Sequence, residues 1–159
     1  MKYLVRQKVF SFRDSFTIKN EFGDDCFNVY GKILSFGNKL TLTDLQGREL
    51  YYIEQRLFRL LPEYTIYQNG VPVANVKRIF RLFRPSFNIT SNYGDFNIDG
   101  NLWAYDFSIF KNGAPVAIIS KKWFSFSDTY GVSINDNEDA AFMLALVIVL
   151  DQVYHDGKK

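Results

Sequence analysis

Apolar and polar positions alternate in short runs along most of this chain. Six of these runs recur at a step of about 23 residues, and each has apolar side chains at alternate positions. Such a pattern is typical of a strand with one buried face. The runs are Phe16–Ile18, Leu40–Leu42, Tyr64–Ile66, Phe87–Ile89, Phe107–Ile109 and Tyr130–Val132. We expect each run to be the first strand of a hairpin.

A turn centred on glycine follows each of the first five runs, at Gly23, Gly47, Gly70, Gly94 and Gly113. Two of these turns contain Asn-Gly, the strongest short hairpin signal, because both central residues of a type I′ turn adopt positive φ. Segments 64–74 and 107–117 align across their Asn-Gly turns without a gap. Six units of two strands predict about twelve strands between residues 3 and 134.

A basic residue followed by apolar residues precedes most of these units. The five-residue motif has a basic residue first, an apolar residue third and Phe or Leu fifth. Its copies begin at Lys8, Lys32, Arg56, Arg78 and Lys122, and one copy is missing near Gly100. A hairpin-rich chain without repeats would also show glycine at regular intervals. The joint recurrence of the basic residue, the aromatic residue and the turn favours a true repeat.

The end of the chain changes period. The acidic segment 135–139 has the residues of a helix cap, and the following run Ala140–Leu150 is apolar on every face. This predicts a fully buried helix at about 137–154, followed by a disordered tail at 156–159. The run is shorter than the roughly 20 residues that span a bilayer, so we expect no transmembrane segment.

The two patterns together predict how the chain packs. A barrel of about eight strands is just filled by its own side chains, so twelve strands leave room for a helix about 10 Å wide. We therefore predict a single, mainly β domain over 1–159: a 12-stranded antiparallel barrel of six hairpin repeats around a buried hydrophobic C-terminal helix. A sandwich with the helix docked outside would leave one apolar helix face in water.

A family resemblance rests on a few segments. The stretch Tyr64–Arg84, with its Asn-Gly turn, Pro-Val-Ala and Lys-Arg-x-Phe-x-Leu-Phe, resembles the LURP-one-related family, as do Phe16–Lys19 and Leu50–Phe58. The resemblance covers about residues 3–155 and implies the tubby C-terminal-like fold, shared with distant tubby and phospholipid scramblase domains. Those relatives bind phosphoinositides or act on phospholipids, which implies lipid headgroups by analogy of fold. The tubby headgroup-binding motif has no match here.

Composition limits the classes of function. Apolar residues make up 47% of the chain and aromatic residues 18%, which indicates a folded core, and the net charge is only +2. Nucleic acid is therefore an unlikely partner. A single cysteine, Cys26, excludes an internal disulfide and fits a reducing compartment. Charges at Arg6 and Lys8 argue against a signal peptide. We predict a cytoplasmic location, or one at the membrane periphery.

No catalytic constellation emerges from the sequence. The one histidine, His155, lies at the expected frayed end of the helix, and Asp24 and Asp25 beside Cys26 are expected to raise the pKa of its thiol. Phosphate loops, zinc spacings and dinucleotide fingerprints do not occur, so we predict no cofactor and no metal. The acidic run 136–139 is interpreted as a helix cap rather than a calcium site.

Basic clusters are the best candidates for a ligand site. They are Lys77, Arg78, Arg81, Arg84, Lys121 and Lys122, with Arg56 and Arg59 upstream and aromatic residues Phe80, Phe83, Trp123 and Phe124 among them. Such a surface is suited to anionic headgroups. The alternatives are a solvated face or charges that protect strand edges.

Three functional hypotheses remain open. The leading one is a non-enzymatic binding or scaffold module whose ligand is an anionic lipid headgroup or a partner protein. The second is a small-molecule enzyme that uses strand carboxylates among Glu49, Glu54 and Glu63. The third is a membrane-associated lipid-handling protein whose terminal helix inserts into the bilayer.

Overall fold

The computed structural model describes residues 1–7, 15–34, 37–82, 86–123 and 128–156. It contains twelve strands and one helix. Their bounds are β1 (Lys2–Arg6), β2 (Phe16–Asn20), β3 (Asp25–Leu34), β4 (Gly37–Thr43), β5 (Glu49–Gln55), β6 (Glu63–Gln68), β7 (Val71–Ile79), β8 (Ser86–Ser91), β9 (Phe96–Asn101), β10 (Asp106–Lys111), β11 (Ala114–Ser120), β12 (Thr129–Ile134) and α1 (Ala140–Asp156).

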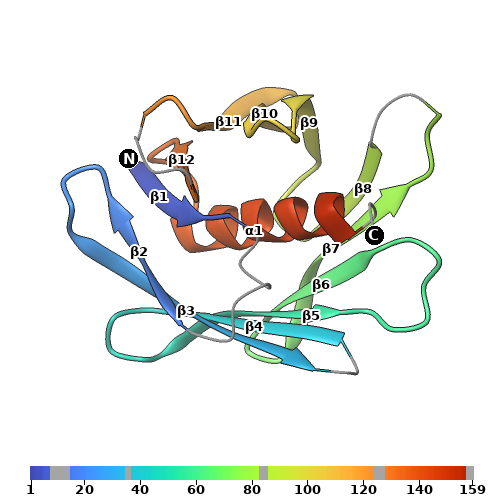
Figure 1. Cartoon of the computed structure of the whole chain (residues 1–159), viewed down its shortest axis with the longest axis horizontal. Coiled ribbons are helices and arrows are strands. Elements are labelled where there is room, and N and C mark those ends of the chain that lie inside the picture. Colours follow the sequence, from blue (N-terminus) through green and yellow to red (C-terminus); the bar gives the residue numbers. More distant parts are fainter. Residues whose placement is uncertain (8–14, 35–36, 83–85, 124–127, 157–159) are drawn as a thin grey trace.

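The twelve strands form one antiparallel sheet that wraps around α1 (Figure 1). All sequence neighbours except β8 and β9 pair, and β1 pairs with β12, so the two ends of the strand series meet. The order in the sheet is β8-β7-β6-β5-β4-β3-β2-β1-β12-β11-β10-β9. The predicted 12-stranded antiparallel barrel is confirmed, with one qualification: β8 and β9 are not hydrogen-bonded to each other, so the barrel is nearly closed.

The hairpin units lie where the alternating runs predict them. The six runs fall in the even-numbered strands, and the five glycine turns join each even strand to the next odd one. Asn69 and Asn112 both have φ of 51°, and the following Gly70 and Gly113 have φ of 77° and 85°. Both turns therefore place two successive residues at positive φ, as the Asn-Gly pairs predict.

Helix α1 begins at Ala140, three residues later than the pattern predicts, because Asp139 caps it. The Asp139 carboxylate accepts the Phe142 backbone N–H at 3.0 Å and the Tyr51 hydroxyl at 2.7 Å. Its acidic neighbours are also partnered: Asp136 lies 3.5 Å from the N-terminal amine, and Glu138 lies 3.1 Å from Lys111. Within the acidic run, Asp139 is therefore the capping residue, whereas Asp136 and Glu138 form ion pairs with other parts of the chain.

The helix is the centre of the core. Side chains from Ala141 to Tyr154 are buried, and they form one cluster with the inward-facing strand residues, such as Ile18, Ile53 and Ile66. Phe142 alone meets the rings of Tyr51, Tyr93 and Phe96. Burial on every side explains why the helix has no polar face. Among the residues placed by the structure, no helix is long and apolar enough to cross a membrane.

Strand direction gives the barrel two different ends. Lys111, the last residue of β10, reaches Glu138 before the helix begins, whereas Arg78 near the end of β7 reaches Tyr154 at its close. Because the sheet is antiparallel, every odd-numbered strand runs towards the carboxyl end of α1. We call the connections at this end the basic rim, defined by its described residues 56–62, 80–82, 102–105 and 121–123.

Candidate functional site

Large apolar side chains are exposed along the basic rim. Six of the twelve exposed large apolar side chains in the described part of the chain lie there: Leu57, Phe58, Leu60, Phe80, Leu82 and Trp103. Phe58 and Leu60 are fully exposed, and Trp103 is 59% exposed. The remaining six are spread over other surfaces of the molecule. Exposed apolar side chains with cations among them are a common feature of interaction surfaces.

The β5–β6 connection contains a residue with a strained backbone among its exposed apolar side chains. Phe58 has φ of 58°, a left-handed conformation that is rare for a bulky side chain. The conformation turns a fully exposed ring towards solvent, where it gains no burial that would offset the strain. Strained residues of this kind concentrate at functional loops. The segment Arg56–Leu60 is also the third copy of the basic-apolar motif.

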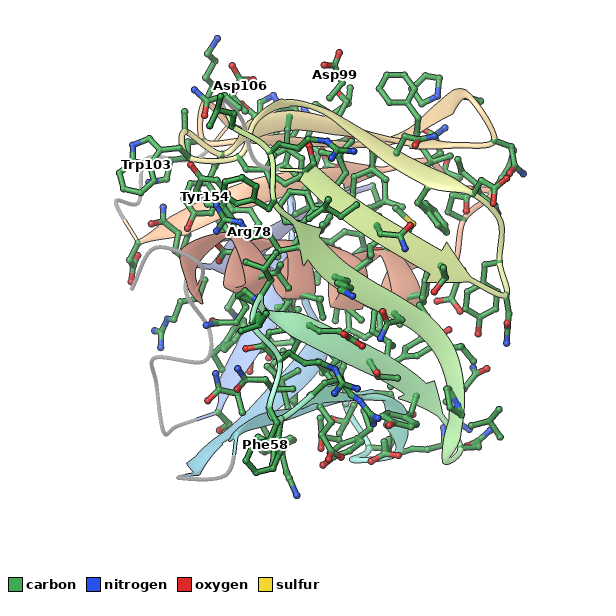
Figure 2. All side chains as sticks on the ribbon, turned by 90° about the vertical axis from the view of Figure 1, so that its right-hand side faces the viewer. Phe58, Arg78, Asp99, Trp103, Asp106 and Tyr154 are labelled. Carbon is green, nitrogen blue, oxygen red and sulfur yellow. The ribbon has the colours of Figure 1, made fainter. Side chains whose placement is uncertain are left out.

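A cation and two aromatic rings cap the carboxyl end of α1. The Arg78 guanidinium donates to the Tyr154 backbone carbonyl at 3.1 Å and lies 5.8 Å from the centre of the Tyr154 ring. Trp103 contacts the same ring edge-on at 6.2 Å, and Figure 2 shows the three side chains together. The positive charge of Arg78 thus satisfies a terminal carbonyl of the helix and complements its dipole.

A second polar cluster lies one helical turn earlier. Tyr105 donates its hydroxyl to the buried Asp151 carboxylate at 2.7 Å, and Lys121 lies 5.2 Å above the Tyr105 ring. Tyr130 stacks on Tyr105 at 4.8 Å, and its fully buried hydroxyl has no hydrogen-bond partner among the described residues. Burial, followed by the charge of Asp151, raises the pKa of Tyr105 and of Tyr130 well above that of a free phenol.

The predicted ligand residues separate into three groups. Arg78 and Lys121 both lie near the carboxyl end of α1, Arg78 in contact with Tyr154 and Lys121 above the ring of Tyr105, which bonds Asp151. Arg81 and Lys122 are exposed on the basic rim. Lys77 lies on the outer wall of β7, next to Arg78 in sequence but on the other face of the strand. Arg84 lies outside the described residues.

Aromatic residues at the helix end were missed by the sequence reasoning. Trp103 and Tyr105 occupy the β9–β10 connection, at the position where the repeat lacks its basic-apolar copy. The missing motif copy, with a tryptophan in its place, is the one sequence feature that could have indicated them. Tyr154 gave no signal, because it reads as the continuation of an apolar helix.

Two of the three strand carboxylates line one pocket. Glu49 and Glu54 line a shallow pocket of about 410 Å³ on the outer wall, together with Tyr52 and Tyr67. Burial and the charge of Glu54 raise the pKa of Tyr52 to about 12. A phenol held protonated this far above neutrality does not act as a base. The enzyme hypothesis remains a prediction.

Glu63 has a different role from the other two carboxylates. It lies 3.2 Å from Arg59 and also accepts the Asn75 side-chain amide at 3.1 Å. This ion pair joins the β5–β6 connection to the start of β6, so Arg59 has a structural role.

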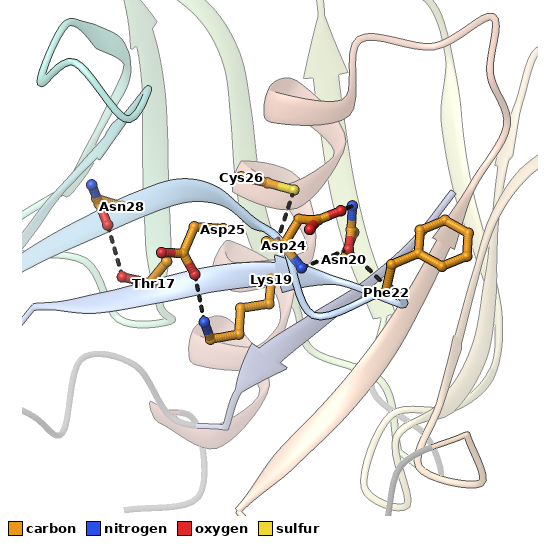
Figure 3. Close-up of polar contacts among 8 residues, drawn as sticks. All are labelled: Thr17, Lys19, Asn20, Phe22, Asp24, Asp25, Cys26 and Asn28. Carbon is orange, nitrogen blue, oxygen red and sulfur yellow. Dashed lines mark hydrogen bonds and ion pairs between the residues drawn. The ribbon is translucent and has the colours of Figure 1, made fainter.

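Cys26 lies beside a turn whose polar groups are already bonded to one another (Figure 3). Its thiol donates to the Asp24 carbonyl at 3.5 Å, while Lys19 pairs with Asp25. Burial raises the pKa of the Cys26 thiol, and the charges of Asp24 and Asp25 add to this against an opposing backbone hydrogen bond from Asn20. The predicted elevation of the thiol pKa is confirmed. Within the described residues, no three His, Cys, Asp or Glu side chains converge as metal ligands.

Comparison with known sequences decides the family. The sequence model of the LURP-one-related family matches residues 1–151. The chain belongs to the LURP-one-related family. Among curated relatives, the uncharacterised protein YxjI of Bacillus subtilis (strain 168) is 35% identical over 158 residues, covering 99% of this chain and 96% of YxjI.

The fold of this LURP-one-related protein also occurs in a plant protein. An X-ray structure of an Arabidopsis thaliana protein superposes with a TM-score of 0.69 and covers 96% of this chain and 90% of that chain. The two sequences are 18% identical, so the likeness concerns the fold.

Proposed function

We propose that this protein is a non-enzymatic binding module that docks its basic rim on the surface of an anionic membrane. The observation that carries the proposal is that exposed apolar side chains and cations share the same connections. Leu57, Phe58 and Leu60 alternate with Arg56 and Arg59, and the pattern continues in the β7–β8 connection with Phe80, Arg81 and Leu82. A membrane interface accepts both kinds of group, since apolar side chains enter the acyl boundary while cations stay near headgroups.

The magnitudes fit reversible docking. Phe58 and Leu60 are fully exposed, and burying such a side chain contributes about 1.5–3 kcal/mol each. A cation near an anionic surface contributes about 1 kcal/mol. Two apolar and two basic residues together therefore support binding in the weak, reversible range.

The cations on the basic rim and beside it differ in whether they already have a structural role. Arg78 bonds the helix carbonyl, and Arg59 pairs with Glu63. Arg81 and Lys122 are exposed. We therefore assign headgroup contact first to Arg81 and Lys122, and a supporting role to Arg78.

Vesicle sedimentation tests the proposal. The whole chain is mixed with phosphatidylcholine vesicles, either pure or containing about one third phosphatidylserine, a composition that gives a strongly negative surface. We expect the protein to pellet with the anionic vesicles. The double variant Phe58→Ser, Leu60→Ser should lose about a hundredfold in partitioning, the equivalent of roughly 3 kcal/mol. Phe22→Ser is the matched control, because Phe22 is 75% exposed in the β2–β3 turn at the opposite end.

A double charge-reversal variant tests the electrostatic part of the proposal. Arg81→Glu with Lys122→Glu should weaken anionic binding by more than tenfold and leave neutral vesicles unaffected. Arg48→Glu in the β4–β5 turn is its control. Equal recovery of the wild-type chain in the supernatant with both vesicle types would refute membrane docking and leave the rim to a protein partner. Equal losses in the rim and control variants would also refute it.

A further inference from the structure

The barrel has an open seam between β8 and β9. In the described chain, β8 pairs with β7 alone and β9 with β10 alone. The two strands are joined by the turn at residues 92–95 and separate from it (Figure 1). A pocket of about 340 Å³ occupies the seam. Both strands are therefore sheet edges that face a common cavity.

The direction of the β8 backbone groups follows from one hydrogen bond. The Asn92 N–H donates to the Val73 carbonyl of β7 at 2.9 Å. In an antiparallel sheet, the N–H and C=O groups of one residue both point to the neighbouring strand on one side, and those of the next residue both point to the other side. Thr90 and Asn88 therefore bond β7, whereas Ile89 and Phe87 direct their N–H and C=O into the seam.

The same reasoning applies to β9. The Asn112 N–H donates to the Asp95 carbonyl at 2.7 Å, so Asp95 and every second residue after it face β10. Phe96 and Ile98 then direct their backbone groups into the seam. Their side chains, like those of Phe87 and Ile89, pack against the core below. The seam thus combines unpaired backbone groups with an apolar floor.

Strand β8 lacks the devices that usually protect an edge. Natural edge strands carry lysine, proline, bulges or inward charges that block another strand. Residues Ser86–Ser91 read Ser-Phe-Asn-Ile-Thr-Ser, with no charge and no proline, and pair with β7 without a bulge. On the β9 side, Asp99 is exposed and points away from the barrel (Figure 2).

We propose that the seam is a strand-addition site, in which an extended peptide segment of a partner pairs antiparallel with β8. Residues directly opposite each other in such a pair share a face, so apolar peptide side chains would cover Phe87 and Ile89. The alternate side chains of the peptide, on its outer face, would be polar and would include a lysine within reach of Asp99. The backbone of such a peptide would form hydrogen bonds with the N–H and C=O groups of Phe87 and Ile89, whereas an acyl chain would bury these groups without partners.

A synthetic peptide that alternates valine with threonine and lysine is the probe. Binding is measured by fluorescence anisotropy, and amide hydrogen exchange of the whole chain locates it. We expect at least tenfold slower exchange at the Phe87 and Ile89 amides, and little change at Thr90, whose N–H already faces β7. Two N-methylated peptides are compared. Methylation of the alternate residues that face β8 should abolish binding, whereas methylation of the other set should preserve it.

A protein variant provides a second test. Ile89→Lys places an inward-facing charge on the edge and should abolish peptide binding, whereas Ile118→Lys on the exposed face of β11 should not change it. Circular dichroism checks folding, and if Ile89→Lys does not fold, the methylated peptides decide alone. Absence of binding at millimolar peptide, or equal binding of both methylated peptides, overturns the proposal. Protection of Phe87 and Ile89 that rises with protein concentration without peptide also overturns it, since the seam would then be an interface between copies.

Discussion

Substitution of Leu146 distinguishes a core helix from one that inserts into a membrane. Leu146 lies in the middle of α1 and is fully buried. Leu146→Ala removes buried side-chain atoms from a site surrounded by strands, so the cavity should lower the free energy of unfolding by about 2–5 kcal/mol. For a domain of this size each kcal/mol lowers the midpoint of thermal unfolding by roughly 2–4 °C, which predicts a fall of about 10 °C.

Urea and thermal unfolding followed by circular dichroism measure this effect. Leu60→Ala on the basic rim is the matched control, because the same side chain is fully exposed there and its removal should change stability by less than about 0.5 kcal/mol. Leu146→Asp should be worse than Leu146→Ala at neutral pH, since it buries an unpaired carboxylate. Burial raises the pKa of such a group, so this variant should be less unstable near pH 4 than at pH 7.

The result that would refute a core helix is specific. If Leu146→Ala and Leu60→Ala unfold at the same midpoint, or if Leu146→Asp leaves the barrel intact at pH 7, the side chain contributes nothing to the core. The apolar run would then be available for insertion into a bilayer.

Three further predictions concern the polar groups around the helix. Tyr130→Phe removes a buried hydroxyl that has no partner in the described chain, so stability should stay equal or rise, whereas Tyr105→Phe leaves Asp151 without a donor and should cost about 1–3 kcal/mol in urea unfolding. Asp139→Ala removes the helix cap and the acceptor of the Tyr51 hydroxyl, so it should lower the free energy of unfolding by about 1–2 kcal/mol, and Asp139→Asn by less. Because burial raises the pKa of Tyr105 and Tyr130, the folded chain holds these phenol protons more tightly than the unfolded chain. The urea midpoint should therefore be insensitive to these groups below about pH 10 and fall above it. A midpoint that does not fall above this pH would contradict the prediction.

Local signals account for the elements that the sequence predicted well. The Asn-Gly turns at Gly70 and Gly113 need no distant contact, because positive φ at two adjacent residues is a property of the turn itself. The strand count followed from alternation, since a period of two holds only for a strand with one buried face. The start of the helix was placed three residues early because Asp139 reads as a first-turn acid until its carboxylate is seen to accept the Phe142 amide.

The basic residues show where sequence reasoning reached its limit. Lys77 and Arg78 are adjacent, yet one side chain lies on the outer wall and the other bonds the end of α1. Lys121 lies near the same helix end but belongs to the β11–β12 connection, 43 residues after Arg78. Strand direction and register decide these positions, and neither is encoded in the spacing of the basic motif.

By itself, the sequence determined the number of hairpins, their turns and the burial of the terminal helix, because each of these depends on the period of apolar side chains within a short segment. Only the tertiary structure decided that the described residues of the motif copies at Arg56, Arg78 and Lys122 lie near the carboxyl end of α1 with Phe58 and Leu60 exposed, and that the barrel stays open between β8 and β9. Those features depend on how twelve strands close around one helix, and closure is a property of the whole sheet rather than of any segment.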